Sequence, residues 1–213
     1  MNMIIDRHKI VDDIHYKVSG VSGADWEAKA CKYVEEGVTL QVKNFITGDK
    51  YKLQHIYCGW DFVRRMVPLA ILFIKPHFIY RDKHGIETEA SKLFHFYSPG
   101  RRRFFCIENE TYDFCVHADY ITSISLPDKQ IAVCREVSRD RRYHVNQYEM
   151  QYSKCMSGKE HILLLLLLFH DRTRVARRQA AGPNGGTPMY NWEPLDRRKH
   201  RAKWRPEDDD GFE

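Results

Sequence analysis

Apolar and polar side chains alternate with a period of two over much of the chain. One such segment spans residues 38–45, and a second spans residues 51–57. Between them, Thr47-Gly48-Asp49 has the composition of a tight turn, because glycine adopts positive φ freely and aspartate bonds to its own backbone. Two alternating segments joined by such a turn predict a β-hairpin.

The same arrangement of strand, polar turn and strand recurs four more times. The expected hairpins cover 78–93, 104–117, 120–137 and 142–152, with turns at 82–85, 108–110, 127–129 and 146–147. Evenly spaced short strands of this kind are typical of antiparallel sandwiches and closed barrels. They predict a mainly β fold.

A helical spacing precedes these hairpins. Trp26, Ala30 and Val34 fall every four residues, and Gly37 supplies a stop signal. This pattern predicts a helix over residues 24–36. Residues 1–37 are therefore expected to form an N-terminal segment separate from the hairpins.

The chain changes character after residue 157. Residues 162–169 are all apolar and rich in leucine, which favours helix, and we expect a helix over 159–170. A helix that is apolar on every face has to be surrounded by protein. The pattern therefore predicts an antiparallel closed β-barrel domain, residues 38–178, that encloses this helix.

The last part of the chain, residues 179–213, reads as a disordered charged tail. Residues 182–188 have linker composition, 197–205 form a basic block and 207–210 an acidic one. One hypothesis for the function is therefore a protein-interaction or scaffold domain that recruits a partner through residues 197–213 of the tail. The acidic block opposes nucleic-acid binding by its basic neighbour, so nucleic acid is disfavoured.

Composition agrees with a folded domain. Hydrophobic residues make up 43% of the 213 residues, which excludes disorder throughout, and the net charge of +5 permits contact with acidic surfaces. No segment reaches the length of a transmembrane helix. The six cysteines are scattered and do not form a disulfide framework, so we expect reduced thiols and a cytoplasmic or peripheral-membrane protein.

Three segments together resemble the tubby C-terminal-like superfamily, which includes tubby domains, phospholipid scramblases and LURP-one-related proteins. They are the turn motifs at 78–85 and 125–132 and the apolar run 162–169 followed by Asp171. The resemblance covers residues 40–174. It implies a closed barrel with a helix through its middle and an association with lipid. Gln130 stands where a second turn glycine is expected, and the N-terminal segment and the tail have no family counterpart.

Two groups of basic residues suggest an anionic-lipid site beside the apolar run 67–74. A basic surface of this kind gains about 1 kcal/mol per residue near an anionic membrane. The alternative is an ordinary solvated loop. The candidate lipid-binding residues are Arg64, Arg65, Lys75, Arg101, Arg102 and Arg103.

Catalytic and metal motifs are missing from the sequence. There is no G-x-S-x-G, no C-x-x-C and no H-x-x-x-H, so we predict no catalytic residues, no metal ligands and no cofactor. The sequence favours a non-enzymatic binding domain over an enzyme or a small-molecule carrier, because the apolar helix is expected to fill the lumen where a ligand would bind.

Overall fold

The computed structural model describes residues 1–10, 13–20, 26–33, 37–56, 77–90, 102–116, 121–127, 129–139 and 145–180. Within these ranges, side chains are described except at 9–10, 13–14, 31–33, 37–38, 77, 102–104, 116, 138–139, 145–146 and 172–180. The expected tail beyond residue 180 lies outside this part of the chain.

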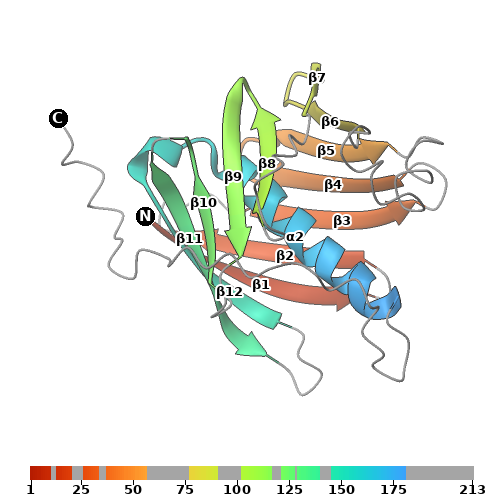
Figure 1. The fold of residues 1–213 in the computed structure, drawn as a ribbon, viewed down its shortest axis with the longest axis vertical. Coiled ribbons are helices and arrows are strands. Elements are labelled where there is room, and N and C mark those ends of the chain that lie inside the picture. The colour runs from red at the N-terminus through yellow and green to blue at the C-terminus, as the bar shows by residue number, and fades with distance from the viewer. Residues whose placement is uncertain are drawn as a thin grey trace.

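Twelve antiparallel strands form one sheet (Figure 1). The first seven are β1 (Asn2–Ile10), β2 (Asp13–Gly20), β3 (Trp26–Tyr33), β4 (Gly37–Asn44), β5 (Lys50–Ile56), β6 (His77–Arg81) and β7 (Glu87–Glu89). The other five are β8 (Arg102–Ile107), β9 (Glu110–Val116), β10 (Thr122–Ser125), β11 (Gln130–Arg139) and β12 (Val145–Tyr152). A 3-10 turn, η2 (Lys154–Met156), leads into helix α2 (Glu160–Ala180). The mainly β, antiparallel fold is confirmed.

The strand order makes the sheet a nearly closed barrel. It runs β7-β6-β5-β4-β3-β2-β1-β12-β11-β10-β9-β8, so β1 and β12 pair in the middle and β7 and β8 form the two edges. These edges approach each other, but they are not paired by hydrogen bonds in the sheet order. The described barrel is therefore open at one seam.

The N-terminal segment belongs to this sheet, and the expected helix over 24–36 is wrong. Residues 26–33 form β3, which pairs with β2 and β4. Trp26 and Ala30 lie four residues apart, a spacing that fits a helix face and also one face of a strand. Ala28 decides between them: it is fully buried together with Trp26 and Ala30, as a period of two requires. The predicted domain boundary between 37 and 38 is wrong for the same reason, since β3 pairs with β4 across it.

Most predicted hairpins are confirmed, including those that join β4 to β5, β6 to β7, β8 to β9 and β10 to β11. The exception is the turn expected at 146–147. These residues lie inside β12, which pairs with β1 on one side and β11 on the other. Asparagine followed by glutamine is a weak turn signal, and two neighbouring strands outweigh it.

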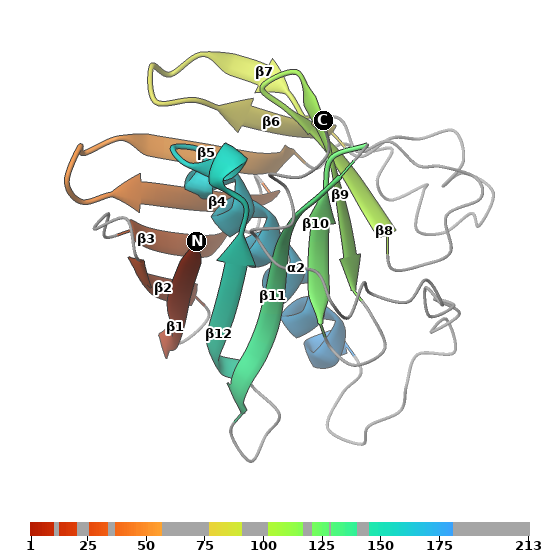
Figure 2. The ribbon, with the colours of Figure 1, turned by 90° about the vertical axis from the view of Figure 1, so that its left-hand side faces the viewer.

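Helix α2 starts at Glu160 and runs ten residues beyond the predicted end at 170, so it also covers the first residues of the expected tail. Residues 162–168 are each at most 1% exposed. The helix contacts β3, β4 and β5, and Phe169 packs edge-on against Phe78 of β6 and Phe105 of β8. Both ribbon views place α2 between the two halves of the sheet (Figures 1 and 2). Complete enclosure of the helix goes beyond these contacts and stays a prediction.

An ion pair fixes the helix to the first strands. The Arg7 guanidinium of β1 lies 2.7 Å from the Asp171 carboxylate, and both side chains are almost fully buried. Tyr16 of β2 donates a 2.6 Å hydrogen bond to the same carboxylate. Burial, followed by the Asp171 charge, raises the pKa of Tyr16 well above its usual range, so the phenol stays a donor at neutral pH.

We expect Leu165→Lys to prevent folding, because the substitution places an unpaired charge at a fully buried position. Leu165→Met is the control and should cost less than about 1.5 kcal/mol, since it conserves volume and polarity. Thermal unfolding followed by circular dichroism measures both. A cooperative melt of the lysine variant close to that of the wild type would refute the buried position of the helix.

We expect Asp171→Asn to lower the free energy of unfolding by about 3–5 kcal/mol, because the Arg7 charge stays buried without its carboxylate. Tyr16→Phe removes one hydrogen bond from the same carboxylate and should cost only about 1 kcal/mol. Urea unfolding compares the two variants. An asparagine variant no less stable than the phenylalanine variant would show that the ion pair is not what holds α2 to β1.

Candidate functional site

The residues predicted to bind lipid fall mostly outside the described part of the chain. Arg64, Arg65, Lys75 and Arg101 lie beyond it, as does the apolar run 67–74. Arg102 and Arg103 begin β8, where they pair with Cys115 and Phe114, but their side chains are not described. Whether these six residues form one basic surface therefore stays a prediction, and so does partner recruitment by residues 197–213.

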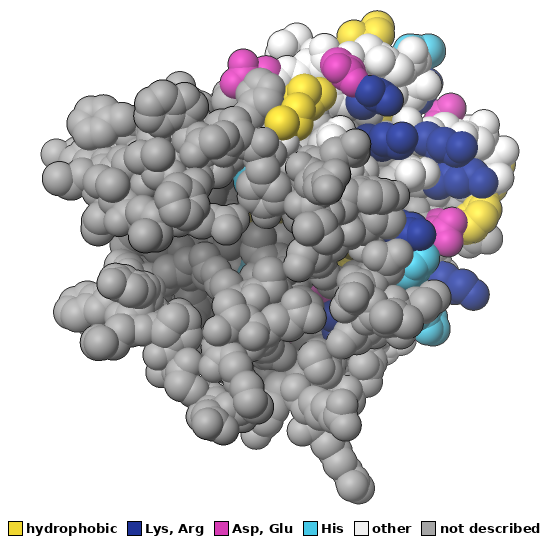
Figure 3. Space-filling view, turned by 90° about the vertical axis from the view of Figure 1, so that its right-hand side faces the viewer, with side chains coloured by type: hydrophobic (Ala, Val, Ile, Leu, Met, Phe, Trp, Pro, Cys, Tyr) yellow, Lys and Arg dark blue, Asp and Glu magenta, His cyan; other side chains and the backbone are white. Residues whose placement is uncertain are grey.

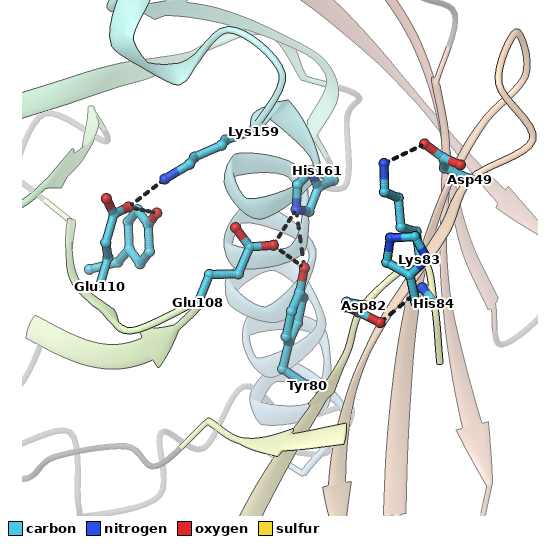
Figure 4. Close-up of polar contacts among 10 residues, drawn as sticks. Asp49, Tyr80, Asp82, Lys83, His84, Glu108, Glu110, Lys159 and His161 are labelled. Carbon is cyan, nitrogen blue, oxygen red and sulfur yellow. Dashed lines mark hydrogen bonds and ion pairs between the residues drawn. The ribbon is translucent and has the colours of Figure 1, made fainter. Parts of the chain in front are cut away.

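A buried polar cluster lies at the start of α2 and was not predicted. Tyr80 of β6 donates a 2.7 Å hydrogen bond to Oε1 of Glu108, in the turn between β8 and β9. Nε2 of His161, the second residue of α2, lies 3.1 Å from the Tyr80 hydroxyl and 3.3 Å from the same Glu108 oxygen (Figure 4). Three segments far apart in sequence thus meet at one histidine nitrogen.

The hydrogen bonds assign the tautomer of His161. Because Tyr80 gives its proton to Glu108, Nε2 of His161 serves best as a second donor to that carboxylate. Nδ1 then carries a lone pair, and it is buried without a hydrogen-bond partner among the described residues. The ring stacks on Tyr51 with centroids 3.7 Å apart.

Burial lowers the pKa of His161 to about 4, and the nearby Glu108 carboxylate opposes this shift only partly. Protonation would place a second N–H at Nδ1, where the described structure offers no acceptor. His161 is therefore neutral at physiological pH. A neutral imidazole beside a carboxylate and a phenol resembles an acid–base centre in composition.

The burial of the side chains in this cluster argues against a catalytic role, because a substrate would have to reach them. The His161 side chain is 3% exposed, and Tyr80 is equally buried, while Glu108 reaches solvent with 33% of its side chain. A second link runs parallel to it: Lys159 lies 3.1 Å from Glu110, which also accepts a hydrogen bond from Tyr112. These contacts tie the β8–β9 turn to the start of α2. The arrangement fits a structural latch better than a site that receives a substrate.

Basic side chains gather on the outer face of β4 and β5, a surface that we call the basic face. Lys43 and Lys50 are directly opposite each other across the two strands, and Lys52 is opposite Gln41 two pairs further on, on the same face. Their neighbours Val42, Tyr51 and Leu53 point to the core, so these lysines point outward. Figure 3 shows Lys and Arg side chains interspersed with Asp, Glu and His side chains over the described part of one side of the molecule.

Three acidic groups near the basic face already have partners. Asp49 pairs with Lys83 at 3.8 Å, Glu87 pairs with Arg81, and Asp82 accepts hydrogen bonds from backbone N–H groups of its own turn. No ion pair to Lys43, Lys50 or Lys52 is found among the described residues. On the other side of β4, Glu27 of β3 is directly opposite Lys43, so Lys50 and Lys52 are the two lysines with no acidic residue opposite them across the paired strands.

Comparisons with known proteins do not identify the chain. No protein-family model matches it, and neither the curated proteins nor the solved structures include a match. The resemblance to the tubby C-terminal-like superfamily therefore stays a prediction.

In the part of the chain that is described, no helix has the length and apolar character to cross a membrane, and no three His, Cys, Asp or Glu side chains are grouped as metal ligands.

We expect the stability of the wild type to fall as the pH drops from 6.5 to about 4. The pKa of His161 is near 6.5 in the unfolded chain and about 4 in the folded one, so the unfolded chain binds the proton first. This group alone contributes up to about 1.4 kcal/mol per pH unit over that window, and its contribution is fully present above it. Urea unfolding at pH 7, 6 and 5 measures the slope.

His161→Phe keeps an aromatic ring on Tyr51 but removes the titrating group, so its unfolding free energy should depend less steeply on pH between 6.5 and 5. His84→Gln is the matched control, because it removes an exposed histidine from a turn that lies outside the buried polar cluster. Equal slopes for the wild type and His161→Phe would contradict the assignment.

Proposed function

We propose that this chain is a non-enzymatic binding domain that associates with anionic phospholipid at the cytosolic face of a membrane. The observation that carries the proposal is the basic face, where Lys43, Lys50 and Lys52 project from adjacent strands and form no ion pair among the described residues. The pairing of β4 with β5 holds these three charges close together on one outward face. A close group of cations suits a membrane surface, which presents many anionic head groups.

The expected affinity is modest. Each lysine near an anionic surface contributes about 1 kcal/mol, so three contribute about 3 kcal/mol, or roughly a hundredfold in partitioning. Binding should weaken with salt, because charges are screened over about 10 Å at 0.1 M ionic strength. The predicted lipid-binding arginines and Lys75 would add to this sum if they share the surface.

The buried polar cluster favours binding over catalysis. Its histidine and tyrosine are enclosed by Tyr51, Trp26 and the helix start, and both serve hydrogen bonds that join elements of the fold. A general base has to reach the proton that it abstracts. Nothing in this geometry presents His161 to a substrate.

Reversing the three lysines tests the proposal. We expect Lys43→Glu, Lys50→Glu and Lys52→Glu in one chain to lower binding to vesicles that contain phosphatidylserine by at least tenfold, because attraction becomes repulsion at all three positions. Co-sedimentation of the full chain with vesicles of phosphatidylcholine alone, or with added phosphatidylserine, measures the effect over a salt series.

A charge-matched control lies on the other half of the sheet. Lys129, Arg135 and Lys154 are exposed there, and changing all three to Glu alters the net charge equally. This control should bind almost as the wild type does. An equal loss in both variants would show that net charge alone governs binding, and no loss in the first would place the site elsewhere. Changing Arg101, Arg102 and Arg103 to Glu tests the site expected from the sequence.

A further inference from the structure

Exposed apolar side chains gather at two turns of the sheet. Phe45 and Ile46, between β4 and β5, are 54% and 68% exposed, and Ile86, between β6 and β7, is 60% exposed. Large apolar side chains at such exposure are ordinary when scattered singly, but a group of them marks an interaction site. We call these three residues the apolar tips.

The two turns are neighbours in space. Strands β4 to β7 pair in chain order and alternate in direction, so the β4–β5 and β6–β7 turns lie at the same end of the sheet. Figure 2 shows both turns projecting from the same side of the molecule. Lys83 of the second turn reaches Asp49 of the first at 3.8 Å (Figure 4). The apolar tips therefore belong to one surface.

Internal hydrogen bonds hold both turns in shape. Oδ1 of Asn44 accepts from the backbone N–H of Ile46 at 2.8 Å and of Thr47 at 3.1 Å. Oδ1 of Asp82 likewise accepts from His84 at 2.9 Å and from Ile86 at 2.8 Å. Each turn also has a glycine with positive φ. The apolar tips are thus displayed on ordered backbone, which reduces the entropy lost when they bind.

Cations flank the apolar tips together with acidic groups that are already paired: Asp49 pairs with Lys83, and Glu87 pairs with Arg81. Nζ of Lys43 lies 5.3 Å from the centroid of the Phe45 ring, and Lys50 and Lys83 are exposed beside the turns. The apolar tips thus project at the end of the basic face. Apolar groups at the end of a face that carries several lysines match the layering of an anionic bilayer, in which head-group charge lies above the acyl chains. This complementarity favours a membrane over a protein surface.

We propose that Phe45, Ile46 and Ile86 insert into the interface of an anionic bilayer while the basic face lies against its head groups. This inference rests on the proposed membrane association and adds how deeply the domain enters the membrane and which side of it faces the membrane. Insertion supplies a second, apolar contribution to binding that salt does not screen. Two contributions with different salt dependence can be separated by matched variants.

The first variant changes all three apolar tips to serine. It should lose at least tenfold in vesicle binding at about 0.5 M salt, where the Debye length is only a few ångströms, and should retain most of the salt-sensitive binding at low salt. The lysine reversal of the preceding section should show the opposite pattern. Both variants alter exposed turn or surface positions, and cooperative thermal unfolding at the wild-type temperature establishes that each is folded.

The second variant measures depth directly. Phe45→Trp places a fluorophore at one apolar tip, and its difference spectrum against the wild type should shift to the blue and be quenched by vesicles with bromine on the acyl chains. Val137→Trp is the control, since Val137 is 56% exposed but lies on β11 in the other half of the sheet. Its fluorescence should not be quenched.

The outcomes separate the two proposals. If the full chain binds anionic vesicles but Phe45→Trp is quenched no more than Val137→Trp, insertion is wrong and membrane association stands. If the wild type binds no vesicles at any salt, membrane association is wrong and insertion fails with it. If the wild type sediments as a dimer that the serine variant loses, the apolar tips bind a second copy of the chain, which also overturns insertion.

Discussion

A helical segment with no polar face imposes the main constraint on this fold. Residues 162–168 of α2 are all leucine or isoleucine, so every direction around the helix has to be filled by protein. On the described side of the helix, β3, β4 and β5 contact it, and Phe78 of β6 and Phe105 of β8 pack on Phe169; buried tyrosines belong to the same core. Each buried tyrosine brings a hydroxyl that needs a hydrogen-bond partner.

The polar groups of the core therefore collect at the two ends of the apolar segment. At one end Tyr16 meets Asp171 and Arg7; at the other Tyr80 meets Glu108 and His161. The middle of the helix makes only apolar contacts among the described residues. This division fixes the helix along its axis, because a shift of one turn would move leucine against charge.

Local sequence patterns were sufficient where one signal dominated. The apolar run predicted α2, and glycine-containing or proline-containing turns predicted the hairpins around Gly48, Gly85 and Pro127. The sequence patterns gave a wrong prediction where the same spacing of apolar residues fits both a helix and a strand. Trp26 and Ala30 satisfy both helix and strand spacing, and only the pairing of β3 with β2 and β4 decides between them. Tertiary pairing is invisible to a local pattern.

The sites show the same limit. Lys52 was visible as an outward position of a predicted strand, but its place beside Lys43 and Lys50 depends on the register between β4 and β5. The contact of His161 with Glu108 spans 53 positions, and that of Tyr16 with Asp171 spans 155. Local spacing in a sequence cannot predict contacts between residues so far apart. Consecutive arginines, by contrast, are easily recognised in the sequence.

The pairing of β1 with β12 has a consequence for how the chain acquires its structure. β1 lies between β2 and β12, with Asn2 opposite Gln151. During synthesis the first strand emerges long before its second neighbour, and one edge of β1 stays open until nearly all strands have been made. Contacts of such high sequence separation slow folding and leave strand edges available for wrong pairing. One edge of β1 therefore becomes protected only when β12, the last strand of the described sheet, has paired with it.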